Sequence, residues 1–453
     1  MHRSLKRTLR GVAVTAVVAV AVPTAGAAQE VVDLGGTSDP TLVRLIEEAL
    51  GANPSLEAAE ARIRVSRAAR TSSLLDLAPT VTAVGGYTRQ RMSGAVFPGL
   101  VGRLPDQDVW EAGVPMSWDV DLFGERRRTL AARSGLVEAA GYDVRDARVL
   151  LAAEVAGGYV RLLGAQDRLA VSRSNAENQR RTLEITEERL AAGRGTALDR
   201  ELASAQLSST LAAIPALEAA VTAEQHRLST LLGREPGTVV ERRADERIVW
   251  PLPPSPPSGE REALLGARPD VVAAERRLEA AGDLVGAARA AYLPRVSLRG
   301  AAGYTASAFH GIGDTGTPRY AVGPVLSWPL LDIGRVRAEV DRARAERSEA
   351  EARHEYVVLQ ARSELATAEA AYERARERLT HLEAAAEASG RATELARLRF
   401  AEGAGDFLEV LDAERRLLEA EDRLADGRTA AADALVSVYR ALGVEWWSRG
   451  SGL

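Results

Sequence analysis

The sequence predicts an α+β membrane protein in which one unit is repeated twice in tandem. Each unit consists of a helix, two strands, a long helix and a second helix. Three observations predict this fold: an internal repeat with an offset of 210–215 residues, period-two alternation in four segments, and two stretches of 68 residues without proline. No stretch after residue 27 is long and apolar enough for a transmembrane helix, so any membrane span must consist of strands.

The first 27 residues have the composition of a secretory signal peptide. Residues 1–10 carry four positive charges and no acid, an apolar run follows from Gly11 to Val22, and Ala25-Gly26-Ala27 fits a small-x-small cleavage site. We therefore expect export and exclude residues 1–27 from the fold. The other 426 residues hold 54 Lys and Arg against 63 Asp and Glu, a net charge of −9. This balance excludes the basic surface typical of nucleic-acid binding.

The composition also excludes several kinds of site. The chain contains no cysteine, which excludes disulfides, zinc–thiolate sites and a lipid-modified cysteine. The five histidines show no metal-ligand spacing, and neither a phosphate-binding loop nor a dinucleotide-binding fingerprint is present. We therefore expect no metal, no cofactor and no enzymatic activity.

The repeat is anchored by prolines, glycines and a tryptophan, which helical composition alone does not place in register. Pro54 and Pro79 recur 215 residues later as Pro269 and Pro294. Further anchors recur at an offset of 210: Trp118 with Trp328, Gly193 with Gly403, Gly195 with Gly405, and Gly233 with Gly443. The exported chain therefore divides into three segments: a first repeat (28–237), a proline-rich linker (238–260) and a second repeat (261–453).

Each repeat is predicted to begin with a helix that ends near a proline and is followed by two strands. We expect the helices at residues 41–77 and 261–292, because proline disfavours their continuation. The strands are predicted where apolar and polar residues alternate: at 79–90, 108–121, 294–306 and 318–331. Alternation over about ten residues is also typical of transmembrane barrel strands.

The two stretches without proline, residues 125–192 and 335–402, are predicted to be long helices. At about 1.5 Å per residue each would be roughly 100 Å long, which indicates coiled-coil or bundle packing. Glycine-containing turns end them, and shorter helices are expected to return along 198–232 and 408–442. The return helix of the first repeat has 35 residues and the first helix of the second repeat has 32. Since they total 67, we expect these two helices to stack end to end beside a long helix.

Four strands per chain cannot close a barrel alone. An open sheet edge is not tolerated in lipid, and the smallest barrels have about eight strands. Two chains would supply eight strands and three would supply twelve. Both predicted strand hairpins turn at one end of the unit, at residues 91–106 and 307–317, and the helices leave from the other end. This geometry predicts a channel that continues into a helical tunnel.

Four motifs carry a resemblance to a known family: Arg268-Pro269-Asp270 at the start of the second repeat, the proline stretch Pro251–Pro257, Leu331-Asp332-Ile333-Gly334-Arg335 at a strand-to-helix junction, and Tyr439-Arg440-Ala441-Leu442-Gly443 followed by Trp446. In this order, and over nearly the whole exported chain, the sequence resembles the TolC-like outer-membrane factors. It is most similar to the OprM/NodT branch of efflux outer-membrane subunits.

The resemblance implies a homotrimer with a twelve-stranded barrel in the bacterial outer membrane and a helical barrel in the periplasm. It implies a passive exit duct for small molecules such as drugs, with a periplasmic adaptor protein and an inner-membrane pump as partners. Many members of that branch carry a lipidated cysteine. Since this sequence has none, we expect the contact with outer-membrane lipid to rest on the barrel alone.

Candidate functional residues are the acids that follow the two glycine turns. The resemblance implies that Asp199, Glu409 and Asp412 form acidic rings that narrow the periplasmic entrance of the pore. Glu409 and Asp412 lie three residues apart on one helix face, and symmetry-related carboxylates around an axis attract cations and should raise one another's pKa. The alternative is that these acids only stabilise the positive end of the helix dipole.

Two other functions remain open from the sequence. The conduit of a type I protein secretion system has the same overall plan, although Arg268-Pro269-Asp270 favours drug efflux. A structural coiled-coil envelope protein would explain the long helices, but it would not explain four alternating segments at equivalent places in both repeats.

Overall fold

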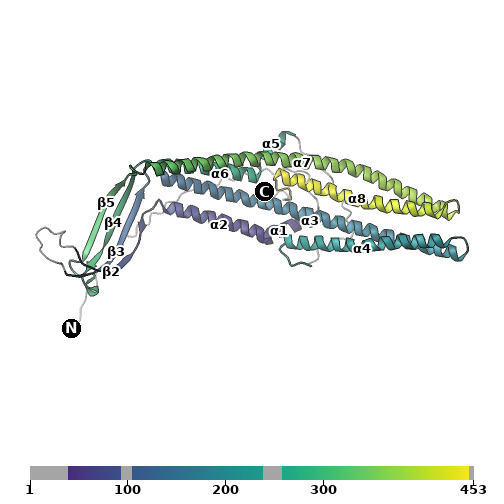
Figure 1. Cartoon of the computed structure of the whole chain (residues 1–453), viewed down its shortest axis with the longest axis horizontal. Helices are drawn as coiled ribbons and strands as arrows, with labels where there is room; N and C mark the ends of the chain where they lie inside the picture. Colours follow the sequence, from purple (N-terminus) through teal and green to yellow (C-terminus); the bar gives the residue numbers. More distant parts are fainter. Residues whose placement is uncertain (1–38, 93–104, 238–257, 448–453) are drawn as a thin grey trace.

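The computed structural model describes residues 39–92, 105–237 and 258–447. The predicted leader at 1–27 and all but the last three residues of the linker at 238–260 lie outside this range. The chain is elongated, with the strands gathered at one end and two helical hairpin turns at the other (Figure 1). Among the described helices, none is both long enough and apolar enough to cross a membrane.

The strands form one antiparallel sheet. Its segments are β1 (Thr80–Val81), β2 (Val84–Gln90), β3 (Gln107–Val120), β4 (Arg295–Ala306) and β5 (Pro318–Ser327). The segments β1 and β2 pair with β3 in the same register, and between them the N–H of Thr82 donates to the carbonyl of Pro115 at 3.1 Å. They therefore act as one strand, so the sheet has four strands in the order β1/β2, β3, β4, β5.

A tryptophan fixes the sheet to the helices in each repeat. The indole N–H of Trp118 donates to the carbonyl of Leu77 at 2.9 Å, and that of Trp328 donates to the carbonyl of Tyr292 at 3.1 Å. The last strand was expected to reach residue 331, but β5 ends at Ser327. The chain turns here instead, because the N–H of Leu330 donates to the carbonyl of Trp328 at 2.9 Å and that of Asp332 donates to the carbonyl of Pro329 at 3.1 Å.

The long helices are α3 (Glu125–Ala191) and α7 (Ile333–Ala401), and the return helices are α4 (Ala197–Leu231) and α8 (Phe407–Leu442). Helix α3 packs against α4 and α8, and α7 packs against α8. The turns between them need glycine, because Gly193 and Gly403 have φ angles of 65° and 75°.

The expectation of one continuous helix at the start of each repeat is wrong. The first is divided into α1 (Pro40–Ala52) and α2 (Pro54–Leu75), and the second into α5 (Ser258–Ala267) and α6 (Pro269–Ala290). Pro54 has no N–H to donate to a carbonyl of α1, so α1 cannot continue through it. The proline ring also forces Asn53 into an extended conformation with φ −76° and ψ 121°. The side chain of Asn53 then caps α2 by accepting a hydrogen bond from the N–H of Ser55 at 2.8 Å.

The expected stacking partner is also wrong, because each return helix meets the broken helix of its own repeat. Helix α4 ends at the α1–α2 junction, where the carbonyl of Leu231 accepts a hydrogen bond from Asn53. Helix α8 ends at the α5–α6 junction, where the Nη1 of Arg268 donates to the carbonyl of Ala441 at 2.6 Å. The last carbonyls of a helix lack partners within it, and each junction supplies a donor.

The hydrophobic core lies at this mid-height level, where both junctions meet α3 and α7. Helix α3 contributes a run of buried small and branched residues, including Ala156 and Val160. Trp446 and Trp447, for which the sequence offered no role, are both buried here. The ring of Trp446 stacks on Tyr439 with centroids 5.2 Å apart. The large aromatic residues near the C-terminus therefore fill the space left at the break in the helices.

Candidate functional site

The two helical turns lie together at the end of the molecule furthest from the sheet (Figure 1). Helix α4 starts after the turn at Gly193 and helix α8 after the turn at Gly403. The predicted acidic residues lie in the first two turns of these helices, with Asp199 on α4 and Glu409 and Asp412 on α8. All three acids therefore lie at the end of the molecule furthest from the sheet.

Asp199 closes a capping box at the start of α4. Its carboxylate accepts a hydrogen bond from the N–H of Thr196 at 2.9 Å, and its own N–H donates to the Oγ1 of Thr196 at 3.1 Å. Two free N–H groups of the helix start are satisfied in this way. This local contact agrees with the alternative in which Asp199 stabilises a helix terminus.

The acids on α8 pair with arginines of the same hairpin. Glu409 contacts Arg399 at 3.3 Å, and Asp412 contacts both Arg415 and Arg416 at 2.8 Å. The hydrogen bond from Arg415, with the positive charges of both arginines, holds the pKa of Asp412 below its ordinary value. Within one chain this is opposite to the rise expected from crowded carboxylates. Both acids are half-exposed, so they remain open to other chains or to solutes.

Arg189 is a tip residue that the sequence reasoning missed. Its guanidinium lies 4.0 Å from the ring centroid of Phe400 and donates to the carbonyl of that residue at 3.1 Å. Phe400 also contacts the ring of buried Phe407, with centroids 5.5 Å apart. Arg189 on α3 therefore ties the end of α7 to the other hairpin. The repeat held the signal, since an offset of 210 relates Arg189 to Arg399, the partner of Glu409.

Glu414 forms a second link between the hairpins, above the turns. It is 3% exposed, and its Oε1 accepts hydrogen bonds from Arg397 at 2.8 Å and from Thr182 at 2.9 Å. These contacts join α8 to α7 and to α3. In the sequence Glu414 looks like any other acid of a charged helix, so no pattern distinguished it.

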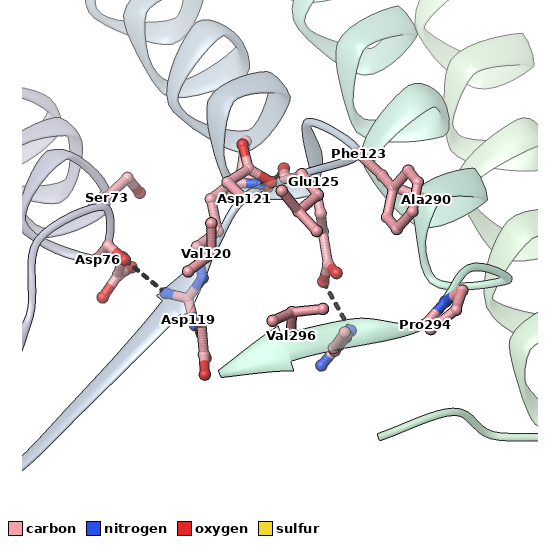
Figure 2. A pocket seen from close by; sticks show the side chains of 14 residues that line it. Ser73, Asp76, Asp119, Val120, Asp121, Phe123, Glu125, Ala290, Pro294 and Val296 are labelled. Atoms are coloured by element: carbon pink, nitrogen blue, oxygen red, sulfur yellow. Dashed lines mark hydrogen bonds and ion pairs between the residues drawn. The ribbon is translucent and has the colours of Figure 1, made fainter. Parts of the chain in front are cut away.

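A cavity of about 230 Å³ lies at the opposite end of the helices, where they meet the sheet (Figure 2). Its charged residues bind one another: Arg126 with Asp119 and with the carbonyl of Asp76, and Arg295 with Glu125 at 2.7 Å. These contacts stabilise the joint between strands and helices. Across the described parts of the chain, no cluster of His, Asp and Glu could hold a metal ion.

Comparison with known proteins gives matches over most of the chain. The family described as outer membrane efflux protein matches residues 45–234 and 261–444. The chain is 32% identical over 419 residues to the outer membrane protein OprJ of Pseudomonas aeruginosa, covering 90% of this chain and 85% of that protein. It is 30% identical over 418 residues to the pyoverdine export outer membrane protein OpmQ of the same species, covering 91% and 87%.

The solved structures give the same result. The outer-membrane channel OprN is similar with a TM-score of 0.81 and 39% sequence identity, covering 90% of this chain and 91% of that chain. The outer membrane protein VceC of Vibrio cholerae is similar with a TM-score of 0.79 and 25% identity, covering 89% and 96%.

Proposed function

Because the chain belongs to the outer membrane efflux protein family, we propose that three copies form the outer-membrane duct of a tripartite efflux pump. The family membership confirms the resemblance inferred from the sequence. The chain is an outer-membrane efflux channel subunit. The trimer, the closed barrel, the pore constriction and the partners are finer features of the proposal, and contacts within the chain support each of them.

The single observation that carries the proposal is the two-faced sheet, whose two edge strands each pair on one side only among the described residues. The register puts Trp118, Leu298 and Pro324 in one row across β3, β4 and β5, and Val114, Ala302 and Tyr320 in another. Both rows lie on the same face, since residues an even number apart along a strand share a face. This apolar face is exposed, with Tyr320 85% accessible. An exposed apolar face on a sheet of this length suits contact with membrane lipid.

The edges of the sheet indicate how the barrel closes. Strands β2 and β5 form the two edges, and they run in opposite directions because each neighbouring pair is antiparallel. The free edge of β5 can therefore pair in antiparallel fashion with the free edge of β2 in the next chain. Three chains would then give twelve strands, an even number with no edge left in the lipid.

The helices supply a tunnel below such a barrel. Each chain offers four helical rows: α3, α7, α4 stacked on the α1–α2 pair, and α8 stacked on the α5–α6 pair. Three chains would surround the axis with twelve rows. Because the apolar face of the sheet points to lipid in this arrangement, the other face lines the inside of the barrel. The inside of the barrel and the helical tunnel then form one continuous path out of the cell.

At the tip, the half-exposed Glu409 and Asp412 support a pore constriction, with Asp199 on the neighbouring hairpin as a weaker candidate because its carboxylate caps α4. A periplasmic adaptor protein would dock at the same end. Leu198 and Leu408 follow the glycine turns at equivalent positions, and they are 64% and 51% exposed. An apolar side chain repeated at each turn offers six similar contacts to a partner around the trimer.

Small molecules are the proposed cargo, since OpmQ is named for pyoverdine export and TtgI of Pseudomonas putida for toluene efflux. TtgI is 27% identical to the chain over 408 residues, covering 90% of this chain and 86% of that protein.

The experiment that tests the trimer exploits the lack of cysteine in the chain. Variants that carry one cysteine on β2 and one on β5 of the same chain should give covalent trimers on oxidation in outer-membrane fractions. The matched control is Val114→Cys with Ala302→Cys, which face each other within one chain and should give only cross-linked monomers. If every β2–β5 pair stays monomeric while the control pair cross-links, the proposed closure is wrong.

A further inference from the structure

The polar face of the sheet contains a row that centres on an arginine. Ser117, Arg299 and Gly323 lie opposite one another on β3, β4 and β5. This row falls between two apolar rows and therefore points to the other face of the sheet. In the barrel proposed above, on which this inference rests, that face lines the pore.

The other charged residues of the polar face that the structure describes are held in ion pairs: Arg319 with Glu111 at 3.2 Å, Arg295 with Glu125 at 2.7 Å, and Asp119 with Arg126. Asp119 also accepts a hydrogen bond from the hydroxyl of Ser297 at 2.7 Å. Within the described parts of the chain, the side chain of Arg299 makes neither an ion pair nor a hydrogen bond. Its charge is therefore not neutralised by the chain that carries it.

The surroundings of Arg299 leave space for a solute. The neighbour on β5 is Gly323, where an added Cβ would meet no atom within 4 Å. The neighbour on β3 is the small side chain of Ser117. Arg299 itself is exposed. An arginine fixed to a strand, with small residues on both sides, presents its guanidinium to the open side of the sheet.

We propose that Arg299 forms an anion-attracting ring inside the strand barrel, with one guanidinium from each of three chains. The ring would favour solutes that carry carboxylate or phosphate groups. A guanidinium stays charged at all physiological pH values and offers a planar fork of donors that matches both groups. Arginine rings select anions in other pores, and charges of one sign that line a low-dielectric wall raise the local concentration of the opposite ion. The acidic tip has the opposite sign, so the two ends of the duct select differently.

The test measures ion selectivity of the purified full-length protein in planar bilayers under a potassium chloride gradient. Arg299→Gln should raise the ratio of potassium to chloride permeability by roughly two- to threefold, the effect of a local potential change of about one kT. Arg299→Lys should keep the native ratio, because it keeps the charge. The matched control is Arg89→Gln, which removes the same charge from the apolar face, where Arg89 contacts Asp106 and Asp108.

A second measurement uses inorganic tripolyphosphate as the probe. Added on the side of the strand hairpins, it should reduce the current through native channels, and Arg299→Gln should relieve this block. Unchanged permeability in Arg299→Gln channels, or equal shifts in Arg299→Gln and Arg89→Gln, would overturn the ring alone. If Arg299→Gln does not assemble, the test rests on the block of native channels by tripolyphosphate. Native channels that tripolyphosphate does not block would overturn the ring. A native protein that opens no channels would overturn the proposed duct as well.

Discussion

The side-chain Nδ2 of Asn53 donates a hydrogen bond of 2.8 Å to the carbonyl oxygen of Leu231, 178 residues further along the chain. The same side chain accepts from the N–H of Ser55 and so caps α2. One residue therefore starts one helix and completes the end of another. In the second repeat Arg268 performs the corresponding link to Ala441, so both mid-height junctions depend on a polar side chain immediately before a proline.

Replacing Asn53 with Ala should lower the free energy of unfolding by roughly 1–3 kcal/mol, since it removes a helix cap and the only side-chain donor to Leu231 that the described residues provide. Asn53→Asp keeps an oxygen for the cap but loses the donor, and its stability should lie between the two. Thermal unfolding followed by circular dichroism measures the order. Equal midpoints for all three proteins would show that the junction does not depend on this side chain.

Gly233 and Gly193 provide a matched pair of substitutions. Their φ angles are 69° and 65°, so alanine costs about the same backbone strain, on the order of 1 kcal/mol, at both sites. A Cβ at Gly233 would lie 2.4 Å from the carbonyl oxygen of Ala52, whereas one at Gly193 would meet no atom within 4 Å. Gly233→Ala should therefore destabilise the protein clearly more than Gly193→Ala in the same thermal assay. Equal losses would mean that the α1–α4 junction adapts to the added methyl group.

The length of the long helices could be predicted from sequence because neither contains a proline and a glycine turn ends each one. The breaks in the first helix of each repeat could not be predicted in the same way. Pro54 and Pro269 are favoured as the first residue of a helix but disfavoured in its interior, so the residue type alone does not show that a new helix starts there. The stacking partner was also beyond the sequence. The summed lengths fit more than one arrangement, and only the hydrogen bonds of Asn53 and Arg268 distinguish them.

At the tip, the roles of two residues could have been predicted from the sequence in part. Thr196 precedes Asp199 by three residues, a spacing typical of a capping box, so the local role of Asp199 was readable. The position of Arg189 was readable from the repeat. Its contact with Phe400 was not, since the repeat relates it to Arg399, which instead contacts Glu409.

Asp146 should make the stability of the protein depend on pH. Burial, followed by the nearby charge of Asp270, raises the pKa of Asp146 to about 6 from an ordinary value of 3.8. A raised carboxyl pKa penalises the folded ionised state, so stability is lost as the pH rises through the window between these values. Acidification from about pH 7.5 to about pH 5 should restore on the order of 1 kcal/mol.

The variant Asp146→Asn should be more stable than the native protein at neutral pH and should lack this contribution to the pH dependence. Glu177→Gln is the control, since it removes a carboxylate from the same helix that pairs with Arg180. Thermal midpoints over the pH range give the comparison. A native protein and an Asp146→Asn variant with parallel pH profiles would contradict the assignment.

The last prediction concerns the acidic tip. Asp412→Ala should weaken the cation preference of channels in planar bilayers and increase their conductance, because it removes three carboxylates near the axis of the proposed trimer and leaves Arg415 and Arg416 without their shared partner. Asp332→Ala, at the strand-to-helix junction, should have a smaller effect. Since the pKa of Asp412 lies below its ordinary value, acidification to about pH 5 should leave the native cation preference intact. A preference that is lost between neutral pH and pH 5 would mean that carboxylate crowding in the trimer outweighs the two arginines. If Asp412→Ala changes neither conductance nor ion preference, the acids only stabilise helix starts and the constriction lies elsewhere.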